Sequence, residues 1–375
     1  MSGETSPSPL GNSRTRADCA NRIYALLKDR TPIPASLEPE LEAIIKRSFP
    51  LPSSTSLAGR STTFDTLGSQ LWNAATNIIR EEEIPQHPRV KRKDTARLVV
   101  LLRTFAFLLV DASHHTSSRR LKDHDQRIRT FKIANKACRF SLGRGELELA
   151  LKVLERSSEY VSKAEENTPV VQLTDEGDGK HSEYQNTLRQ LAAEYYLLRM
   201  THAWKSDRFD VADHFYTKFS QREMASSANL AEKAADLFHE AGKSLSAVKQ
   251  PEDAIKWCER ALSALDACEF EDLSQDAPEL RLAIASTLVD MHLAAKGGNA
   301  GNRTRASNII DQLESAYGMS NRIAVSLMRF QILTNSQPVD ADQLSAILQH
   351  LIRLAVITDK SFKTLVCISI SSERG

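Results

Sequence analysis

The segment DLFHEAGKSLSAVKQPEDAIKWCERAL, residues 236–262, most constrains the fold of this 375-residue chain. Its tripeptide Gly242-Lys243-Ser244 resembles the end of a phosphate-binding loop, but such a loop needs an earlier glycine at the position that Leu237 occupies here. The residues before Leu237 are helix formers and not a β-strand that leads into a loop. The segment therefore predicts two helices joined by a short turn, and not a nucleotide site.

The same segment matches the tetratricopeptide repeat, a helix–turn–helix unit of about 34 residues. When Ala254 is placed at position 20 of the repeat, Gly242 and Ala261 take the small positions 8 and 27. Phe238 and Leu245 then take the apolar positions 4 and 11. Because a glycine inside a helix costs about 1 kcal/mol relative to alanine, we expect Gly242 to serve close packing of the two helices.

Two other segments fit the same template. Ala212 falls at position 20 in residues 206–219, and Ala150 falls there in residues 143–157. A single hairpin leaves an apolar face that only a neighbouring hairpin can cover. The sequence therefore predicts an all-α fold, a tetratricopeptide-like repeat solenoid that forms a right-handed α-α superhelix. An irregular helical bundle is the alternative.

The composition agrees with an all-α chain. Hydrophobic residues make up 41% and aromatic residues 6%, and there are only 14 glycines, a balance that favours helices over sheets. The net charge of +1 indicates no class of partner. We expect a disordered N-terminus at 1–16, followed by an N-terminal helical region at 17–125 that contains a basic loop at 84–94. A tetratricopeptide-like repeat array should occupy 126–365, with a mobile loop at 163–183 and a second loop at 297–305. An atypical tail should follow at 366–375.

The apolar run LVVLLRTFAFLLV, residues 98–110, has the composition of a membrane segment but not its length. A spanning helix needs about 20 apolar residues, and Arg103 lies in the middle of this run. A helix that is apolar nearly all round is typical of the centre of a helical protein. We therefore expect residues 98–110 to be buried among other helices, and we expect no membrane partner.

The sequence offers no pattern for catalysis, for a cofactor or for a metal. Its five cysteines are scattered without CxxC spacing, which is typical of a reduced intracellular protein. His114, His115 and His124 have no cysteine nearby and do not share one face of a helix, so they do not form a metal site. We expect these histidines to be exposed or to lie in loops, and we expect the protein to be no enzyme.

Two stretches are locally basic. Arg89, Lys91, Arg92 and Lys93 form a short cluster, a candidate basic patch. Further basic residues follow the apolar run: Arg119, Arg120, Lys122, Arg127 and Arg129. Such residues can contact nucleic-acid phosphates, but no aromatic residues are interleaved with them, and nearby aspartates dilute the charge. A solvated face, a nuclear-import signal and direct nucleic-acid contact all stay open.

Five segments carry a resemblance to a known family: Leu71-Trp72-Asn73-Ala74, RLVVLLRTFAFLLVDAS (97–113), the hairpin at 236–262, RLAIASTLVDMHL (281–293) and ITDKSFKT (357–364). Across residues 65–365 the chain resembles the fungal meiosis-specific tetratricopeptide-repeat family that includes yeast Zip-four, also called Spo-twenty-two. The resemblance implies a non-catalytic scaffold of sporulating cells, which assembles synapsis-initiation and crossover-promoting proteins on meiotic chromosomes in the nucleus. The implied partners are the synapsis-initiation complex, an XPF-like heterodimer and chromosome-axis proteins.

Two expectations qualify the resemblance. Members are typically much longer, and the final residues FKTLVCISISSERG lose the helical period, so we expect a truncated member of the family. The alternative function is a general tetratricopeptide adaptor that binds peptides or chaperones outside meiosis. Adaptors of that kind grip a carboxylate with side chains on successive first helices, for which this chain offers only Lys243 and Arg139.

Overall fold

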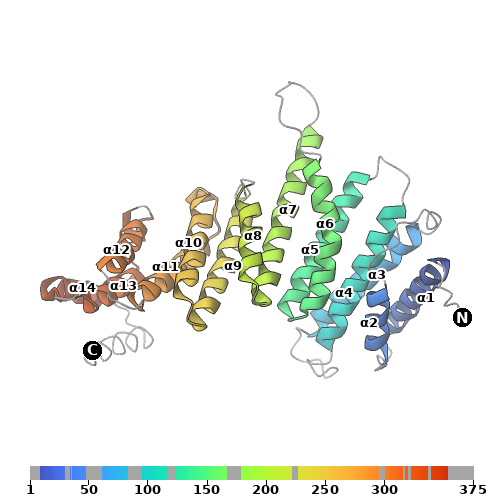
Figure 1. Ribbon diagram of the computed structural model, residues 1–375, viewed down its shortest axis with the longest axis horizontal. Helices are drawn as coiled ribbons and strands as arrows, with labels where there is room; N and C mark the ends of the chain where they lie inside the picture. The colour runs from blue at the N-terminus through green and yellow to red at the C-terminus, as the bar shows by residue number, and fades with distance from the viewer. Residues whose placement is uncertain are drawn as a thin grey trace, which may run out of the picture. The chain divides into compact units, whose positions relative to one another are not determined.

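Every regular element in the described part of the chain is helical, and no strand occurs there (Figure 1). The computed structural model describes residues 9–29, 34, 36–47, 61–82, 95–116, 123–166, 179–221, 227–294, 300–315, 317–319, 322–336 and 339–353. The α-helices are α1 (Pro9–Lys28), α2 (Leu37–Arg47), α3 (Ser61–Glu82), α4 (Thr95–Thr116), α5 (Asp123–Gly143), α6 (Leu147–Glu166), α7 (Gly179–Lys205), α8 (Phe209–Ser220), α9 (Ala228–Ala247), α10 (Pro251–Asp266), α11 (Ala277–Ala294), α12 (Ala300–Ser315), α13 (Ile323–Thr334) and α14 (Ala341–Arg353). A short 3-10 helix, η3 (Phe270–Asp272), precedes α11. The prediction of an all-α chain is confirmed.

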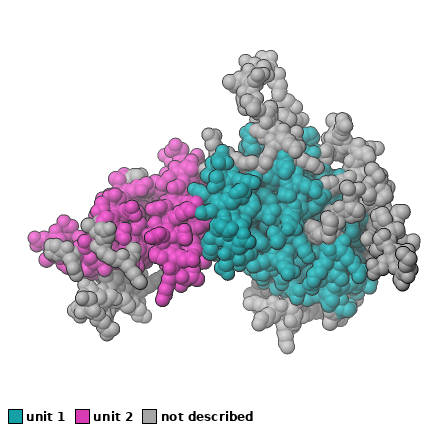
Figure 2. Space-filling view, in the orientation of Figure 1, with its two compact units in different colours: residues 1–224 teal, residues 225–375 magenta. Residues whose placement is uncertain are grey.

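The chain forms two compact units, residues 1–224 and residues 225–375 (Figure 2). In the first unit, each helix from α3 to α8 packs against the next one along the chain. Contacts also join helices two apart in that unit, namely α1 with α3, α2 with α4, α4 with α6, and α5 with α7. In the second unit, successive helices from α9 to α14 pack together, and α11 also contacts α9 and α13. Helical hairpins that stack on one another produce this pattern of neighbours.

Helix α4 forms the centre of the first unit. Its side chains from Leu98 to His114 are all buried except Arg103, and the helix packs against α2, α3, α5 and α6. The prediction of a buried helix over residues 98–110 is therefore confirmed. None of the helices in the described ranges has both the length and the apolar character that crossing a membrane requires.

One hydrophobic cluster of the second unit lies between α11, α12 and α13. Leu282, Ala285 and Val289 follow a helical spacing on α11 and are at most 6% exposed. They pack into one cluster with further buried residues of the neighbouring helices: Ala306, Ile310 and Leu313 of α12, and Val325, Met328 and Ile332 of α13. Burial of this shared apolar face is the main force that holds these helices together.

Three segments that were expected to lack structure are helical in part. Helix α1 begins at Pro9, within the expected disordered stretch 1–16. Helix α6 continues to Glu166 and α7 begins at Gly179, so both enter the expected loop 163–183, while residues 167–178 lie outside the described residues. Helix α12 begins at Ala300, within the expected loop 297–305. The physical reason in α12 is that its core residues begin only at Ala306, so the residues before it carry no apolar periodicity in the sequence.

Candidate functional site

The hairpin of α9 and α10 is held by a close approach at Gly242. A β-carbon built on Gly242 would collide with Sγ of Cys258 and would lie 3.0 Å from the carbonyl oxygen of Ala254. Cys258 and Ala254 both belong to α10. The absence of a side chain at residue 242 therefore lets the backbones of the two helices come together.

Large and small side chains complete this interface. Phe238 is 1% exposed, and its ring lies 5.4 Å from the ring of Trp257 on α10. Leu245, Ala254 and Ala261 are fully buried. The structure thus places all five packing residues named for this hairpin in the buried faces of α9 and α10.

The two remaining packing residues occupy equivalent places in the first unit. Ala150 lies in the first turn of α6 and Ala212 in the first turn of α8, and both are fully buried. Helix α6 packs on α5, and α8 packs on α7. Ala150, Ala212 and Ala254 therefore each lie near the start of the second helix of a hairpin.

The turns of these three hairpins share one backbone conformation, which the sequence did not reveal. Gly145, Asp207 and Lys249 have φ values of 78°, 55° and 62°, in the left-handed region. Each of them stands at the same distance along the chain before its alanine, Ala150, Ala212 or Ala254. Only glycine adopts this region without strain, so an aspartate and a lysine here are held by the surrounding structure.

The hydrogen bonds of the three turns are also the same. The amide N–H of the residue after the left-handed position donates to a carbonyl near the end of the first helix in every case. These bonds are Glu146 to Ser141 at 3.0 Å, Arg208 to Ala203 at 2.8 Å, and Gln250 to Leu245 at 3.0 Å. They satisfy main-chain carbonyls that the end of a helix leaves free. The three hairpins are thus copies of one backbone motif.

A second close approach, missed in the sequence, joins α3 and α4. A β-carbon on Gly68 would lie 2.7 Å from Cγ2 of Val110 and 2.9 Å from the carbonyl oxygen of Ala106. Gly68 lies inside α3, and the other two residues lie on α4. A glycine in the middle of a helical segment is the signal that could have identified this site, as it did for Gly242.

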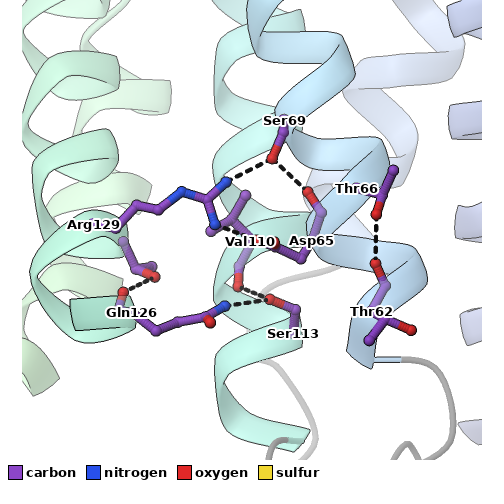
Figure 3. A network of polar contacts seen from close by, with 9 residues as sticks. Thr62, Asp65, Thr66, Ser69, Val110, Ser113, Gln126 and Arg129 are labelled. Atoms are coloured by element: carbon purple, nitrogen blue, oxygen red, sulfur yellow. Dashed lines mark hydrogen bonds and ion pairs between the residues drawn. The ribbon is translucent and has the colours of Figure 1, made fainter. Parts of the chain in front are cut away.

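The basic residues that follow the apolar run contact protein groups where they are described. Arg129 on α5 donates to Oδ1 of Asp65 and to Oγ of Ser69, both at 2.6 Å, and so ties α5 to α3 (Figure 3). Gln126 on the same helix donates to Oγ of Ser113 on α4 at 3.4 Å (Figure 3). Arg127 contacts the hydroxyl of Tyr184 on α7 at 3.4 Å.

The other basic residues of the two basic stretches lie outside the described residues. They are Arg119, Arg120 and Lys122 after the apolar run, and Arg89, Lys91, Arg92 and Lys93 of the candidate basic patch. The structure therefore shows Arg129 in an ion pair with a carboxylate on a neighbouring helix, and it leaves the patch at 89–93 as a prediction.

A buried ionic network joins α4 to α6. Asp111 is fully buried and accepts hydrogen bonds from Nε of Arg156 at 2.7 Å and from the hydroxyl of Tyr160 at 2.5 Å. Burial raises the pKa of Tyr160, and the adjacent Asp111 charge raises it further. The tyrosine thus stays protonated and donates.

The histidines considered for a metal do not come together. His114 is buried, contrary to the expectation that it is exposed or lies in a loop, because it faces the core and stacks on Tyr160 at 5.9 Å between ring centroids. His124 is exposed on α5 and lies edge-on to Tyr184 at 4.2 Å. The side chain of His115 lies outside the described residues. No group of three or more His, Cys, Asp or Glu residues that could hold a metal occurs in the described ranges.

The buried cysteines are protonated thiols. Burial raises the pKa of Cys19 to about 11 and that of Cys258 to about 12. Burial also raises the pKa of Cys138. A thiol in that state is a poor nucleophile at neutral pH, and Cys258 serves here as a packing partner of Gly242.

Four side chains form a stack of alternating aromatic and cationic groups on the first unit. The guanidinium of Arg103 on α4 lies 5.0 Å from the ring centroid of Trp72 on α3 and 4.3 Å from that of Phe140 on α5. The guanidinium of Arg144, just after α5, lies 5.3 Å from the same Phe140 ring. Sequence reasoning used Arg103 only as an argument against a membrane span and did not find this stack.

The comparisons with known proteins bear on the C-terminal part of the chain. A family model described as "Meiosis protein SPO22/ZIP4 like" matches residues 202–369. No curated protein and no solved structure gives a significant match. The matched region includes α8, the α9–α10 hairpin and all the later helices to α14, but it does not include the 71–113 block. Residues 202–369 are therefore similar to the SPO22/ZIP4-like meiosis protein family, in agreement with the resemblance noted for the hairpin at 236–262.

Proposed function

We propose that the protein is a non-catalytic scaffold in meiotic recombination, which assembles synapsis-initiation and crossover-promoting proteins on meiotic chromosomes. The observation that carries the proposal is the match of residues 202–369 to a family of meiosis proteins. The nucleus is the corresponding location. Partners of the kinds named by the resemblance are the synapsis-initiation complex, the XPF-like heterodimer and chromosome-axis proteins.

The architecture that we propose for this scaffold is a right-handed tetratricopeptide-like solenoid. Support comes from the three hairpins with the same turn, which are α5–α6, α7–α8 and α9–α10. In a stack of such hairpins the first helix of each one packs on the first helix of the next. The contacts of α5 with α7, and of α9 with α11 and then α13, follow that rule inside the two units.

The alternative function, a general adaptor that grips a carboxylate, is less well supported. The two cations that it would use are already occupied by carboxylates of this chain. Lys243 donates to Oε1 of Glu240 at 2.8 Å, and Arg139 forms an ion pair with Glu194. A ligand carboxylate would have to displace these partners before it could bind.

Deletion of the gene in the species of origin tests the proposed function. We expect fewer crossovers and lower spore viability, with normal vegetative growth. Affinity purification of the tagged full-length protein from meiotic cells should recover synapsis-initiation proteins. A growth defect in dividing cells, together with recovery of chaperones alone, would support the general adaptor and reject the meiotic scaffold.

A further inference from the structure

The stack of Trp72, Arg103, Phe140 and Arg144 presents two cations that no described carboxylate neutralises. Trp72, Arg103 and Phe140 are half-buried, and Arg144 is exposed. In the described part of the chain, neither arginine side chain makes a hydrogen bond or an ion pair. The Nε atom of Arg103 is buried without a hydrogen-bond partner there. A buried donor without an acceptor is destabilising, so the position of Arg103 has a cost in free energy.

Other arginines of the same unit do have carboxylate partners. These pairs are Arg97 with Glu42 and Glu146, Arg129 with Asp65, Arg139 with Glu194, and Arg156 with Asp111. Arg103 differs from them because aromatic rings, and not acidic groups, contact its guanidinium. Partial burial lowers the pKa of the Arg103 guanidinium, as expected for a cation without a nearby negative charge.

The geometry of the stack favours recognition of planar anions. A guanidinium held against aromatic rings can still present N–H groups to a ligand, and a carboxylate can accept two parallel hydrogen bonds from it. Because Trp72 and Phe140 both contact Arg103, a ligand would have to order this side chain less on binding. Arg144 contacts the same Phe140 ring as Arg103, so a second acidic group of the same ligand can reach it.

We propose that Arg103 and Arg144, held by Trp72 and Phe140, form a docking site for an acidic peptide segment of a protein partner. The proposal deepens the proposed scaffold function, and it rests on that function for the claim that the ligand is a protein. Nucleic acid is a weaker candidate because a polyanion needs several cations in a continuous surface. Among the described arginines of this unit, Arg97, Arg129 and Arg139 are engaged by carboxylates. The described stack itself offers two cations.

Fluorescence anisotropy with the full-length protein tests the proposal. The probe is a labelled peptide with alternating glutamates, and a peptide with glutamine at the same places is the neutral control. A single-stranded oligonucleotide of equal charge forms a third arm, at about 0.15 M salt to limit non-specific attraction. We expect binding of the glutamate peptide alone, with Arg103→Gln and Arg144→Gln each weakening it roughly tenfold.

Matched variants separate docking from general charge and from folding. Arg208→Gln removes the same charge from an exposed arginine paired with Asp210, and we expect it to leave binding unchanged. Arg103→Lys keeps the charge but loses the planar fork, so we expect it to weaken binding nearly as much as Arg103→Gln. Arg144 is exposed, so its variant keeps the fold and tests the site even if Arg103→Gln unfolds the protein.

Three results would overturn the inference. They are equal binding of the glutamate and glutamine peptides, equal losses in Arg144→Gln and Arg208→Gln, and tighter binding of the oligonucleotide through the same two arginines. The test does not depend on meiosis. Peptide binding that needs both arginines, with normal crossovers in the gene deletion, would reject the proposed function and keep the docking site.

Discussion

Gly242 of α9 lies so close to Cys258 of α10 that no β-carbon fits between them. The nearest main-chain atom of α10, the carbonyl oxygen of Ala254, would lie 3.0 Å from that β-carbon and cannot move away without a shift of the helix. The size of the side chain at residue 242 therefore sets how closely α9 and α10 can approach each other. Its substitution measures how tightly the hairpin is packed.

We expect Gly242→Ala to lower the free energy of unfolding by about 1–3 kcal/mol, and Gly242→Leu to lower it further, because both overpack the interface. Urea unfolding followed by circular dichroism measures the change. Gly143→Ala is the matched control, since a β-carbon there meets nothing within 4 Å. Because alanine favours a helix, this control should be neutral or slightly stabilising. Equal effects of the alanine substitutions at residues 242 and 143 would reject the close-packing interpretation.

The double variant Gly242→Ala with Cys258→Ala tests the contact itself. Shortening residue 258 removes the Sγ atom that the new β-carbon would meet. We expect the combined loss of stability to be smaller than the sum of the two single losses, by about 0.5–3 kcal/mol, as for residues in direct contact. Additive losses would show that the two residues do not compete for space.

We expect the turn residues to respond in opposite directions. Lys249→Gly should raise the free energy of unfolding by up to about 1 kcal/mol, because glycine adopts the left-handed conformation without strain. Gly145→Ala should lower it by a similar amount, about 1 kcal/mol, through the backbone alone. A β-carbon at residue 145 meets nothing within 4 Å, so no clash contributes. Thermal unfolding of both variants measures the shifts, and the same sign for both would contradict the shared turn.

Removal of only one member of the buried ion pair between Asp111 and Arg156 should strongly lower the free energy of unfolding. We expect Asp111→Leu to destabilise the protein by about 3–5 kcal/mol, because it removes the buried counter-charge of Arg156, whose other partner Glu159 is more exposed. The same change removes the acceptor of the buried Tyr160 hydroxyl. Arg156→Met combined with Asp111→Leu should recover a large part of that loss, since both desolvated charges are then absent. Chemical unfolding of the single and double variants provides the comparison. A double variant less stable than Asp111→Leu alone would contradict this account.

Two buried histidines, His239 and His292, and the half-buried His202 predict a loss of stability at acid pH. Burial is the largest cause that lowers the pKa values of His202, His239 and His292 from 6.5. The unfolded chain therefore takes up protons near pH 6.5 that the folded chain does not. The neutral histidines therefore contribute their full stabilisation above about pH 6.5. This contribution is lost as the pH falls from 6.5 through the lowered pKa values of the folded state. Urea unfolding at a series of pH values should show this slope.

Two variants test how much His239 contributes to the dependence of stability on pH. His239 shares a hydrogen bond of 2.8 Å with the hydroxyl of Thr287 on α11. His239→Gln keeps a polar partner for Thr287 but removes the titrating group, so we expect a flatter dependence of stability on pH. Thr287→Val should lower the stability at every pH and keep the slope. An unchanged slope in His239→Gln would remove His239 from the explanation.

The sequence predicted the helices well wherever small and apolar residues recur on one face. The spacing of Gly242 and Ala254 indicated a hairpin, and α9 and α10 pack together there. The nearly continuous apolar run of α4 indicated burial for the same reason, and its side chains from Leu98 to His114 are buried except Arg103. By contrast, the start of α12 was missed because the residues before Ala306 carry no such signal.

Features that depend on contacts between distant segments could not be predicted. Nothing in the basic stretch indicates that Arg129 meets Asp65, 64 residues away along the chain. The same holds for Arg103, whose neighbours Trp72 and Phe140 come from two other helices. Local sequence gives the charge of such residues, and only the packing of the helices decides whether that charge is neutralised.

The left-handed turns have a consequence for how these hairpins diverge. Main-chain hydrogen bonds set the turn, and a glycine, an aspartate and a lysine all occupy its left-handed position. Substitutions at this position alter stability only modestly, so related hairpins can lose sequence similarity while they retain the same turn. Ancestral duplication of a hairpin would thus leave its record in backbone geometry long after amino-acid identity has faded.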